Sequence, residues 1–537
     1  MKNAKAKATA RAIPRTVSLS VTTAALAAAV ALPLALFGPP GGDEPAHLYR
    51  TDLVREGVLA WDGFWFAGHY PLASYSLLYY FPAAVLGNVP LAVLAVVASA
   101  ALFAAVCEHE WGVDARWPAF AFAVVASGPL FTGTYPYALG LAALLTCLRA
   151  LQLGRLWLAA IAAVLTLGFS PLAFLFLTLA LVAVAVVRRP MQRRAVLVLA
   201  SAMAFAGAAQ ALALALFPHD ATYPFFRPFE LGAVLAMGVV ATALAWRSRR
   251  ASVLAAFFAL WTATALLAFV IPTPVGENVT RLRGIVVPLV LLVVVLTRFR
   301  PLWLAVTALV GALVYTLTPY VGAALYRGDG RPAERAFWEP ALVFLRAHVS
   351  PAERVEVVPT GDHWEAYWLP HEEFPLARGW YRQLDYAQNR LFYEEPLRAN
   401  EYRAWLRRMG VRYVLLPDTQ LGRAGEQREA ELLRSGRAGL REVMRTRDWR
   451  IWEVPNARTI LPGGVITRYG HDDVSGRLPR AGTYRLAFRF TPYWRVREGN
   501  LCLAETADGM TELRARAAGP FRLEIGLFAR GTASCPS

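Results

Sequence analysis

The chain has 537 residues, of which 56% are hydrophobic and only 17% are charged. A soluble domain carries about 25% charged residues, so this composition excludes an ordinary soluble enzyme. The net charge of +17 does not indicate nucleic-acid binding, because the excess lies mainly in residues 1–324, where 22 Lys and Arg outnumber 11 Asp and Glu. In such an apolar region, positive charge sets the topology of a membrane protein.

Apolar stretches follow one another from residue 18 to residue 324. The hydrocarbon core of a bilayer is about 30 Å thick and requires roughly 20 apolar residues per helix. The stretches lie at 18–37, 88–107, 117–131, 137–153, 156–169, 171–187, 195–217, 230–246, 251–271, 284–297 and 301–324. We therefore predict a polytopic α-helical membrane protein with about eleven transmembrane helices. The two short stretches at 156–187 are separated by Ser170-Pro171. A re-entrant hairpin is therefore an alternative to two full spans there.

The distribution of basic residues predicts the orientation of the chain. With the tail 1–17 placed in the cytoplasm, 17 basic residues of the membrane region fall in cytoplasmic segments and 5 fall outside. This asymmetry agrees with the positive-inside rule and with an odd number of spans. We expect a multi-pass plasma-membrane protein with residues 325–537 outside the cytoplasm.

Residues 325–537 are predicted to form two soluble units. From 325 to 456, helical stretches alternate with short β runs, which is typical of a small α/β domain. From 457 to 537, alternating runs are separated by Gly and Pro, which predicts a small all-β module of sandwich type. Cys502 and Cys535 lie in this module, where a disulfide persists outside the cytoplasm. Two free thiols are the alternative.

The first external loop, residues 38–87, is the richest in polar side chains. Glu44 is followed by proline, which predicts a helix start with Glu44 as N-cap. His47 and Arg50 follow at helical spacing, so we expect their side chains near one another. A carboxylate from Asp43 or Glu44 beside these groups suits proton abstraction next to an anionic substrate. The alternative is that acidic residues at a helix start serve stability alone.

Aromatic residues follow in the same loop, among them Trp65 and Tyr70, with His69 between them. One interpretation is a platform for sugar rings or a prenyl chain. The alternative is the belt of aromatic side chains that many membrane proteins carry at the bilayer interface. Both interpretations are compatible with the same residues.

The later external loops of the membrane region contain Arg227, Asn278, Arg281 and Arg283. Arginine binds phosphate through paired hydrogen bonds, so these loops are candidate binding sites for a phosphorylated substrate. The alternative is that the arginines pair with Glu277 or with lipid headgroups.

In the soluble region, Asp362 and His363 follow a predicted strand, where α/β proteins often carry sites. The run Ala377–Gln383, which includes Arg378, is equally dense in polar and aromatic side chains. We take Asp362, His363 and Arg378 as candidate substrate-binding residues. A solvated loop with structural tryptophans is the alternative.

Motifs for nucleotide or metal binding are absent from the sequence. We find no P-loop, no dinucleotide-binding glycine pattern and no Cys/His set with metal-ligand spacing. Asp43, Glu44 and His47 are the candidate ligands for a divalent cation, but three clustered polar residues are a weak signal. No cofactor is required by the sequence.

The pattern resembles the GT-C superfamily of membrane glycosyltransferases, especially actinobacterial members. The resemblance rests on the cytoplasmic N-terminus, the span count, the acidic pair Asp43-Glu44 that opens the first external loop, the segments Gly42–Arg50 and Trp65–Pro71, and a soluble C-terminal region. It implies a polyprenyl-phosphate-linked sugar as donor and a loop acid as general base, which corresponds to Asp43 with Glu44 beside it. Some members need a divalent metal such as Mg²⁺ or Mn²⁺ and others do not.

The sequence therefore favours an inverting glycosyltransferase at the outer face of the plasma membrane. It would move a sugar from a polyprenyl-phosphate donor to a glycan or lipid acceptor of the cell envelope, with Asp43 as base and Arg281 and Arg283 on the leaving phosphate. Two alternatives remain: a transporter or flippase of lipid-linked envelope precursors, and a non-catalytic envelope scaffold. Membrane lipids are expected partners, and nucleic acid is not.

Overall fold

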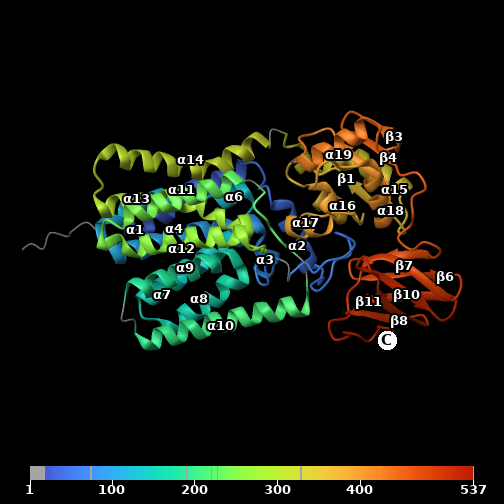
Figure 1. Ribbon diagram of the computed structural model, residues 1–537, viewed down its shortest axis with the longest axis horizontal. Helices are drawn as coiled ribbons and strands as arrows, with labels where there is room; N and C mark the ends of the chain where they lie inside the picture. The colour runs from blue at the N-terminus through green and yellow to red at the C-terminus, as the bar shows by residue number, and fades with distance from the viewer. Residues whose placement is uncertain are drawn as a thin grey trace, which may run out of the picture.

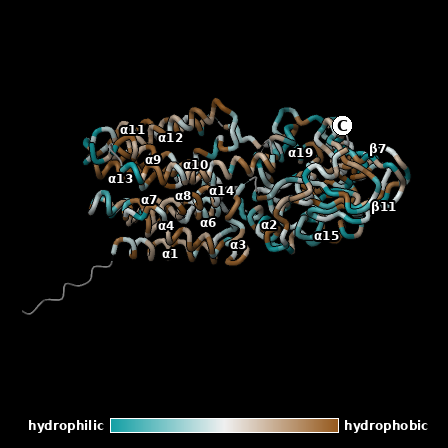
Figure 2. The backbone as a smooth tube through the Cα atoms, turned by 90° about the horizontal axis from the view of Figure 1, so that it is seen from below, coloured by the Kyte–Doolittle hydropathy of each residue, from teal (hydrophilic) through white to brown (hydrophobic). Residues whose placement is uncertain are grey.

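The computed structural model describes residues 18–72, 75–188, 192–218, 221–226, 228–326, 329–422 and 424–535. A bundle of long helices forms one end of the molecule, and two units that contain β-sheets form the other end (Figure 1). Most residues of the bundle are apolar, whereas hydrophilic residues concentrate in the two units (Figure 2). The predicted cytoplasmic tail, 1–17, lies outside the described residues.

Each predicted apolar stretch contains helix. The bundle consists of α1 (Leu19–Phe37), α4 (Asn88–Trp111), α5 (Arg116–Val125), α6 (Gly128–Thr132), α7 (Tyr135–Gln152), α8 (Leu156–Phe169), α9 (Pro171–Val187), α10 (Arg193–Leu216), α11 (Pro228–Ala245), α12 (Ser252–Val270), α13 (Val286–Thr297) and α14 (Leu302–Tyr326). Among the described residues, seven helical segments are long and apolar enough to cross a membrane, and α8 and α9 are apolar but shorter. The chain is a membrane protein of the helical type, and its count of eleven spans stays a prediction.

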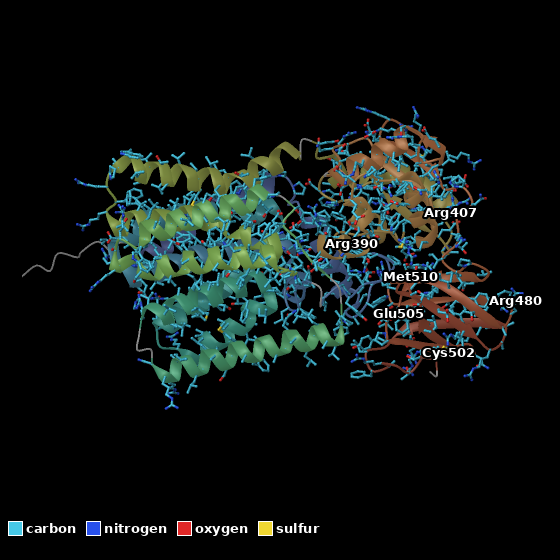
Figure 3. All side chains as sticks on the ribbon, viewed as in Figure 1. Arg390, Arg407, Arg480, Cys502, Glu505 and Met510 are labelled. Carbon is cyan, nitrogen blue, oxygen red and sulfur yellow. A yellow bond between two sulfur atoms is a disulfide. The ribbon has the colours of Figure 1, made fainter. Side chains whose placement is uncertain are left out.

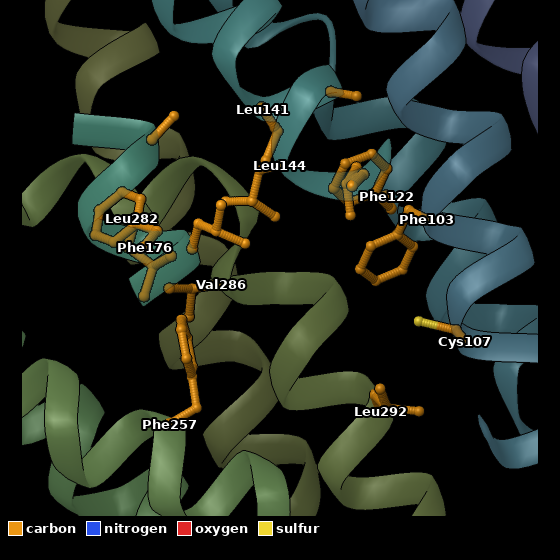
Figure 4. Close-up of a cluster of buried hydrophobic side chains, with 14 of the residues drawn as sticks. Phe103, Cys107, Phe122, Leu141, Leu144, Phe176, Phe257, Leu282, Val286 and Leu292 are labelled. Carbon is orange, nitrogen blue, oxygen red and sulfur yellow. The ribbon is translucent and has the colours of Figure 1, made fainter. Parts of the chain in front are cut away.

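Small side chains allow the helices of the bundle to approach closely. Ala27 and Ala31 of α1 are fully buried, as is Ala100 of the neighbouring α4. The Thr23 hydroxyl donates to the Ala100 carbonyl over 3.2 Å. In a bilayer, such close packing and interhelical hydrogen bonds replace the hydrophobic effect as the source of association. Larger side chains fill the remaining space, including the stacked rings of Phe103 and Phe122 (Figure 4).

The two ends of the bundle differ in their contacts. At the end far from the soluble units, Arg188 pairs with Glu110, and Arg250 pairs with Asp114 at 2.7 Å. At the opposite end, the bundle contacts the soluble units, for example through the Tyr493 hydroxyl, which donates to the backbone of α10. The basic loops therefore lie away from the soluble units. Which of the two ends faces the cytoplasm stays a prediction.

The first soluble unit is an α/β structure. Its sheet has the order β1-β2-β4-β3, in which β1 is parallel to β2 and the other pairs are antiparallel. The elements are α15 (Arg335–His348), β1 (Arg354–Val357), α16 (Glu365–His371), α17 (Arg382–Gln388), α18 (Ala399–Met409), β2 (Val411–Pro417), α19 (Ala424–Arg434), β3 (Arg441–Arg445) and β4 (Trp449–Glu453). Helices and strands alternate in this unit as predicted, and its outer limits stay a prediction.

The second soluble unit contains strands in two sheets, of order β7-β10-β9 and β5-β6-β11-β8. The strands are β5 (Val465–Tyr469), β6 (Asp473–Leu478), β7 (Gly482–Arg489), β8 (Trp494–Glu498), β9 (Leu501–Glu505), β10 (Met510–Ala515) and β11 (Gly519–Ile525). Leu486 and Leu513 of one sheet share a fully buried core with Val474 and Leu523 of the other. This is the packing of a β-sandwich.

A disulfide joins Cys502 of β9 to Cys535 near the end of the chain. Cys502 lies at the lower edge of the β-sandwich in Figure 3. Of the two alternatives left open by the sequence, the structure contains the disulfide. Cys107 and Cys147 of the bundle are free and buried.

The orientation can be tested with Trp246→Cys, at the basic end of α11, and Val465→Cys, in β5. Their side chains are 79% and 58% exposed, whereas the native free cysteines are buried. A membrane-impermeant maleimide should label Val465→Cys in intact spheroplasts and Trp246→Cys only after lysis. The reverse pattern would show that the soluble units lie in the cytoplasm.

Candidate functional site

A cavity of about 580 Å³ lies between the bundle and the α/β unit. The short helices α2 (Glu44–Arg55) and α3 (Tyr80–Leu86) lie at this junction with α17 (Figure 1). Of the residues predicted from the sequence, the cavity is lined by Asp43, His47, Arg50, Asn278, Arg281, Arg283, Asp362 and His363. Segments more than 300 residues apart in the chain thus contribute to a single site.

Asp43 is held in place by backbone contacts rather than by its own side chain. Its N–H donates to the Thr132 carbonyl over 3.1 Å. Gly133 adopts φ +76°, and a side chain on it would clash with the backbone of Asp43 and Glu44. Asp43 is the N-cap of α2, one residue before the predicted cap, and its carboxylate makes no capping hydrogen bond. Its carboxylate is therefore not engaged in capping, although its charge lies at the positive end of the α2 dipole.

Glu44 has a different environment from its neighbour. One of its carboxylate oxygens accepts hydrogen bonds from the Gly41 N–H at 2.7 Å and from the Tyr135 hydroxyl at 2.9 Å. Glu44 does not line the cavity. Its side chain fixes the turn that precedes α2, so the structure separates the two acidic residues that the sequence grouped as catalytic.

The two arginines of the 3₁₀ segment Gly276–Ile285 have different partners. Arg281 lies 3.5 Å from an oxygen of Asp43. Arg283 forms a 2.8 Å ion pair with Glu230, which is buried. Neither arginine takes the alternative partner Glu277, which accepts a hydrogen bond from a backbone N–H instead. The charge of Arg283 is thus neutralised within the bundle, and Arg281 is the cation beside Asp43.

His47 and Arg50 lie on the wall of the cavity formed by α2. His47 is 2% exposed, and its Nδ1 lies 3.1 Å from the Tyr80 hydroxyl. Burial lowers the pKa of His47 to about 3, although Asp43 acts in the opposite direction. The imidazole is therefore neutral near pH 7. The Arg50 guanidinium lies 5.4 Å and 5.1 Å from the rings of Tyr75 and Tyr381, which are favourable cation–π distances.

Trp65 and His69 do not line the cavity. Trp65 is fully buried, its indole N–H donates to the Ala366 carbonyl at 3.0 Å, and its ring packs directly on Gly379. His69 lies 3.5 Å from the buried Asp62 carboxylate. Trp65 thus joins the first external loop to the α/β unit, whereas His69 packs within the loop, and neither side chain is exposed to the cavity.

Tyr70 and Arg378 also lie away from the cavity. The Tyr70 hydroxyl is 2.8 Å from the Thr491 hydroxyl in the β-sandwich. Arg378 lies in the core of the α/β unit, with ion pairs to Glu356 and Glu429 at 2.5 Å and 2.6 Å. Both residues are structural contacts in the described fold. Arg227 lies outside the described residues.

The cavity residues that were not selected from the sequence include Tyr75, Trp380 and Arg382. Trp380 and Arg382 belong to the polar and aromatic run 377–383, from which the sequence singled out Arg378. Arg378 and Arg382 lie four positions apart, and the composition of the run does not distinguish them. Only the position of α17 shows which of them faces the cavity.

The candidate metal ligands of the first external loop do not fit a divalent ion. Glu44 directs its carboxylate to Gly41 and Tyr135, and His47 directs Nδ1 to Tyr80. Within the described part of the chain, no group of three or more His, Cys, Asp and Glu is arranged to hold a metal. We therefore derive no chemical step through a metal ion.

Comparisons with known proteins add little. No family model matches the chain, and no curated protein matches it in sequence. One similar solved structure is the crystal structure of the Archaeoglobus fulgidus oligosaccharyltransferase in complex with Zn and sulfate. Its sequence identity is 14% and its TM-score 0.40, over 74% of this chain and 68% of that chain. A likeness of this degree leaves function to be argued from the site.

The lowered pKa of His47 predicts a specific acid sensitivity. Between pH 6.5 and about 3, the unfolded chain binds a proton that the folded protein excludes, so His47 contributes a loss of stability as the pH falls. We expect the melting temperature to fall less steeply between pH 7 and pH 4.5 in His47→Gln than in the wild type. Parallel curves for the two proteins would contradict the buried neutral imidazole.

Proposed function

We propose that the protein is a membrane glycosyltransferase that moves a sugar from a polyprenyl-phosphate carrier to a cell-envelope acceptor at the outer face of the plasma membrane. The observation that carries the proposal is the pair formed by Asp43 and Arg281, 3.5 Å apart. The pair lies in a cavity with one wall from membrane helices and one from a soluble unit.

The membrane wall of the cavity suits a lipid-linked donor. Leu172, Leu214 and Pro319 line it, from α9, α10 and α14. A prenyl chain can lie against these apolar side chains while its phosphate reaches Arg281. A guanidinium binds phosphate oxygens through charge-assisted, paired hydrogen bonds.

The chemistry follows from the proximity of the two groups. Asp43 accepts the proton of the acceptor hydroxyl, whose oxygen forms a bond to the anomeric carbon of the sugar. The bond from that carbon to the phosphate oxygen breaks, and the phosphate leaves with the electron pair. Arg281 stabilises the charge that develops on it. A single displacement inverts the anomeric configuration, and the short distance between base and phosphate site orients the reactants.

The runner-up functions receive less support. A transporter of charged precursors needs a polar path, and intramembrane charges mark such paths. In the described helices of the bundle, charged residues lie at helix ends, such as Glu110 in the last turn of α4 and Glu230 in the first turn of α11. A non-catalytic scaffold does not account for a carboxylate and a guanidinium that converge in a cavity.

The proposal predicts that Asp43→Asn lowers the turnover number by about 10²- to 10⁴-fold, because a general base contributes that much. Arg281→Gln should lower it by about 10²- to 10³-fold, the usual effect of removing one group that stabilises developing charge. The assay uses purified protein in lipid nanodiscs, radiolabelled polyprenyl-phosphate sugars and a crude envelope extract as acceptor.

Asp52→Asn is the matched control, because Asp52 lies on the same helix and pairs with Arg55 at 2.8 Å. It should retain wild-type transfer. Normal turnover in Asp43→Asn would remove Asp43 from the mechanism. If the wild type transferred no sugar but moved the labelled lipid across the bilayer, the protein would be a transporter.

A further inference from the structure

The soluble wall of the cavity contains an arginine that forms no ion pair among the described residues. Arg382 is the first residue of α17 and lines the cavity. Its Nε is buried and has no hydrogen-bond partner among the described residues. Burial lowers the pKa of Arg382, but the nearby Tyr223, Tyr393, Glu426 and Asp43 raise it, so the guanidinium stays charged. The guanidinium lies 5.1 Å from the Trp380 ring, so its position is fixed by stacking.

Other buried arginines of the α/β unit are fully engaged. Arg378, four residues before Arg382, pairs with two glutamates. Arg354 donates to the Tyr469 hydroxyl and to the Met409 carbonyl, both at 2.8 Å. Burying a charge without partners costs several kcal/mol. Arg382, which is half-buried, has neither an ion pair nor a hydrogen bond of this kind among the described residues, and it faces the cavity.

His363 completes the polar surface beside Arg382. Its Nδ1 lies 3.0 Å from one oxygen of Glu365, whose other oxygen accepts from the N–H and the hydroxyl of Thr360. Its ring stacks on Trp380 at a centroid distance of 3.4 Å. His363 also has φ +61°, a conformation that a non-glycine residue rarely adopts and that is often found at binding sites. Because Nδ1 donates to a carboxylate, Nε2 of the neutral ring is left as an acceptor for a ligand hydroxyl.

We propose that Arg382 binds a second anionic group, distinct from the phosphate assigned to Arg281. The chemical class is a carboxylate or phosphate whose oxygens accept hydrogen bonds from the guanidinium, with His363 beside it as an acceptor for a hydroxyl of the same ligand. The identity of the ligand that carries this anionic group rests on the proposed function. The source is either an acidic sugar of the acceptor, which arrives from the aqueous side, or the second phosphate of a diphosphate carrier.

The test is a binding measurement by isothermal titration calorimetry on the full-length protein in nanodiscs. Two pairs of probes are used: glucuronate against glucose, and farnesyl diphosphate against farnesyl phosphate. In at least one pair, the wild type should bind the more anionic probe about 10- to 100-fold more tightly, as expected for hydrogen bonds to charged groups. A preference for glucuronate indicates the acceptor, and a preference for the diphosphate indicates the carrier.

Arg382→Gln should abolish this preference, and Arg382→Lys should reduce it by keeping the charge without the paired geometry. Arg390→Gln is the control, because Arg390 is exposed on the same unit outside the cavity (Figure 3). No preference in the wild type, or an unchanged preference in Arg382→Gln, would overturn the proposal. Since the readout is binding with Asp43 intact, its outcome is separate from that of the transfer assay.

A second, independent feature is an apolar turn of the β-sandwich. Leu527 and Phe528 follow β11, and their side chains are 48% and 102% exposed. Fully exposed large apolar side chains on a soluble surface indicate an interaction site when they are adjacent. No other part of the proposed mechanism uses them.

The turn is tied to the end of a candidate membrane span. The Gly526 N–H donates to the Tyr493 carbonyl at 2.9 Å, and the Tyr493 hydroxyl donates to the Leu216 carbonyl at 2.7 Å. Leu216 is the last residue of α10, one of the helices long enough to cross a bilayer. Ile525 and Phe217 both pack against the cluster formed by Trp61, Tyr70 and Tyr493. Leu527 and Phe528 are therefore close to the level at which α10 leaves the membrane.

We infer that this turn inserts into the lipid interface and holds the β-sandwich on the bilayer. Phe528→Cys, labelled with an environment-sensitive fluorophore in nanodiscs, should show blue-shifted emission that nitroxide-labelled lipids quench. The control is labelled Val465→Cys, which is 58% exposed in β5, on the far side of β6 from β11. Equal emission and equal quenching at the two positions would overturn the inference.

Discussion

The Asp62 carboxylate, which is completely buried, joins the first external loop to α2 and to the β-sandwich. One of its oxygens accepts hydrogen bonds from the Tyr49 hydroxyl of α2 at 2.9 Å and from the Phe64 N–H at 3.0 Å, and His471 of the β-sandwich lies 2.9 Å from the same oxygen. Burial raises the pKa of Asp62, but the contacts with His471, with His69 and with the Phe64 N–H together outweigh burial and lower the pKa. Because α2 carries Asp43 at its start, the geometry of the site depends on this buried network.

Backbone hydrogen bonds also fix the first external loop against the soluble units. The first external loop donates from the Gly63 N–H to the His471 carbonyl, and its Phe64 and Ala67 carbonyls accept from Leu376 and Arg489. The loop thus pairs with both soluble units while its two ends stay in the membrane region. A loop fixed on three sides has little freedom to move, which suits a site whose groups must be positioned before the substrates arrive.

Charge pairing divides the cavity into two walls with different tasks. In the bundle, Arg283 is neutralised by Glu230, which leaves Arg281 beside Asp43 for a ligand from the membrane side. In the α/β unit, Arg378 is neutralised and Arg382 is left on the cavity surface. On the bundle side Arg281 pairs with Asp43, the proposed base, whereas on the α/β side Arg382 forms no ion pair among the described residues.

The sequence by itself determined the features that depend on local patterns. Apolar stretches of near-span length placed the helices of the bundle, because the bilayer selects for continuous hydrophobicity. The alternation of helical and β runs placed the elements of the α/β unit, and the spacing of Gly and Pro indicated the strands of the β-sandwich. The position of Asp43 at the start of a short external helix was also visible from the sequence.

Only the tertiary structure decided which polar side chains meet. Asp62 and His471 are separated by 409 positions, and no local pattern relates them. Asp43 and Glu44 are adjacent in sequence, yet one faces the cavity and the other fixes a turn. Trp65 has the composition of a sugar platform but is fully buried between domains, and Arg382 rather than Arg378 reaches the site. These outcomes depend on how separate domains pack against one another, which the period and composition of a single segment do not encode.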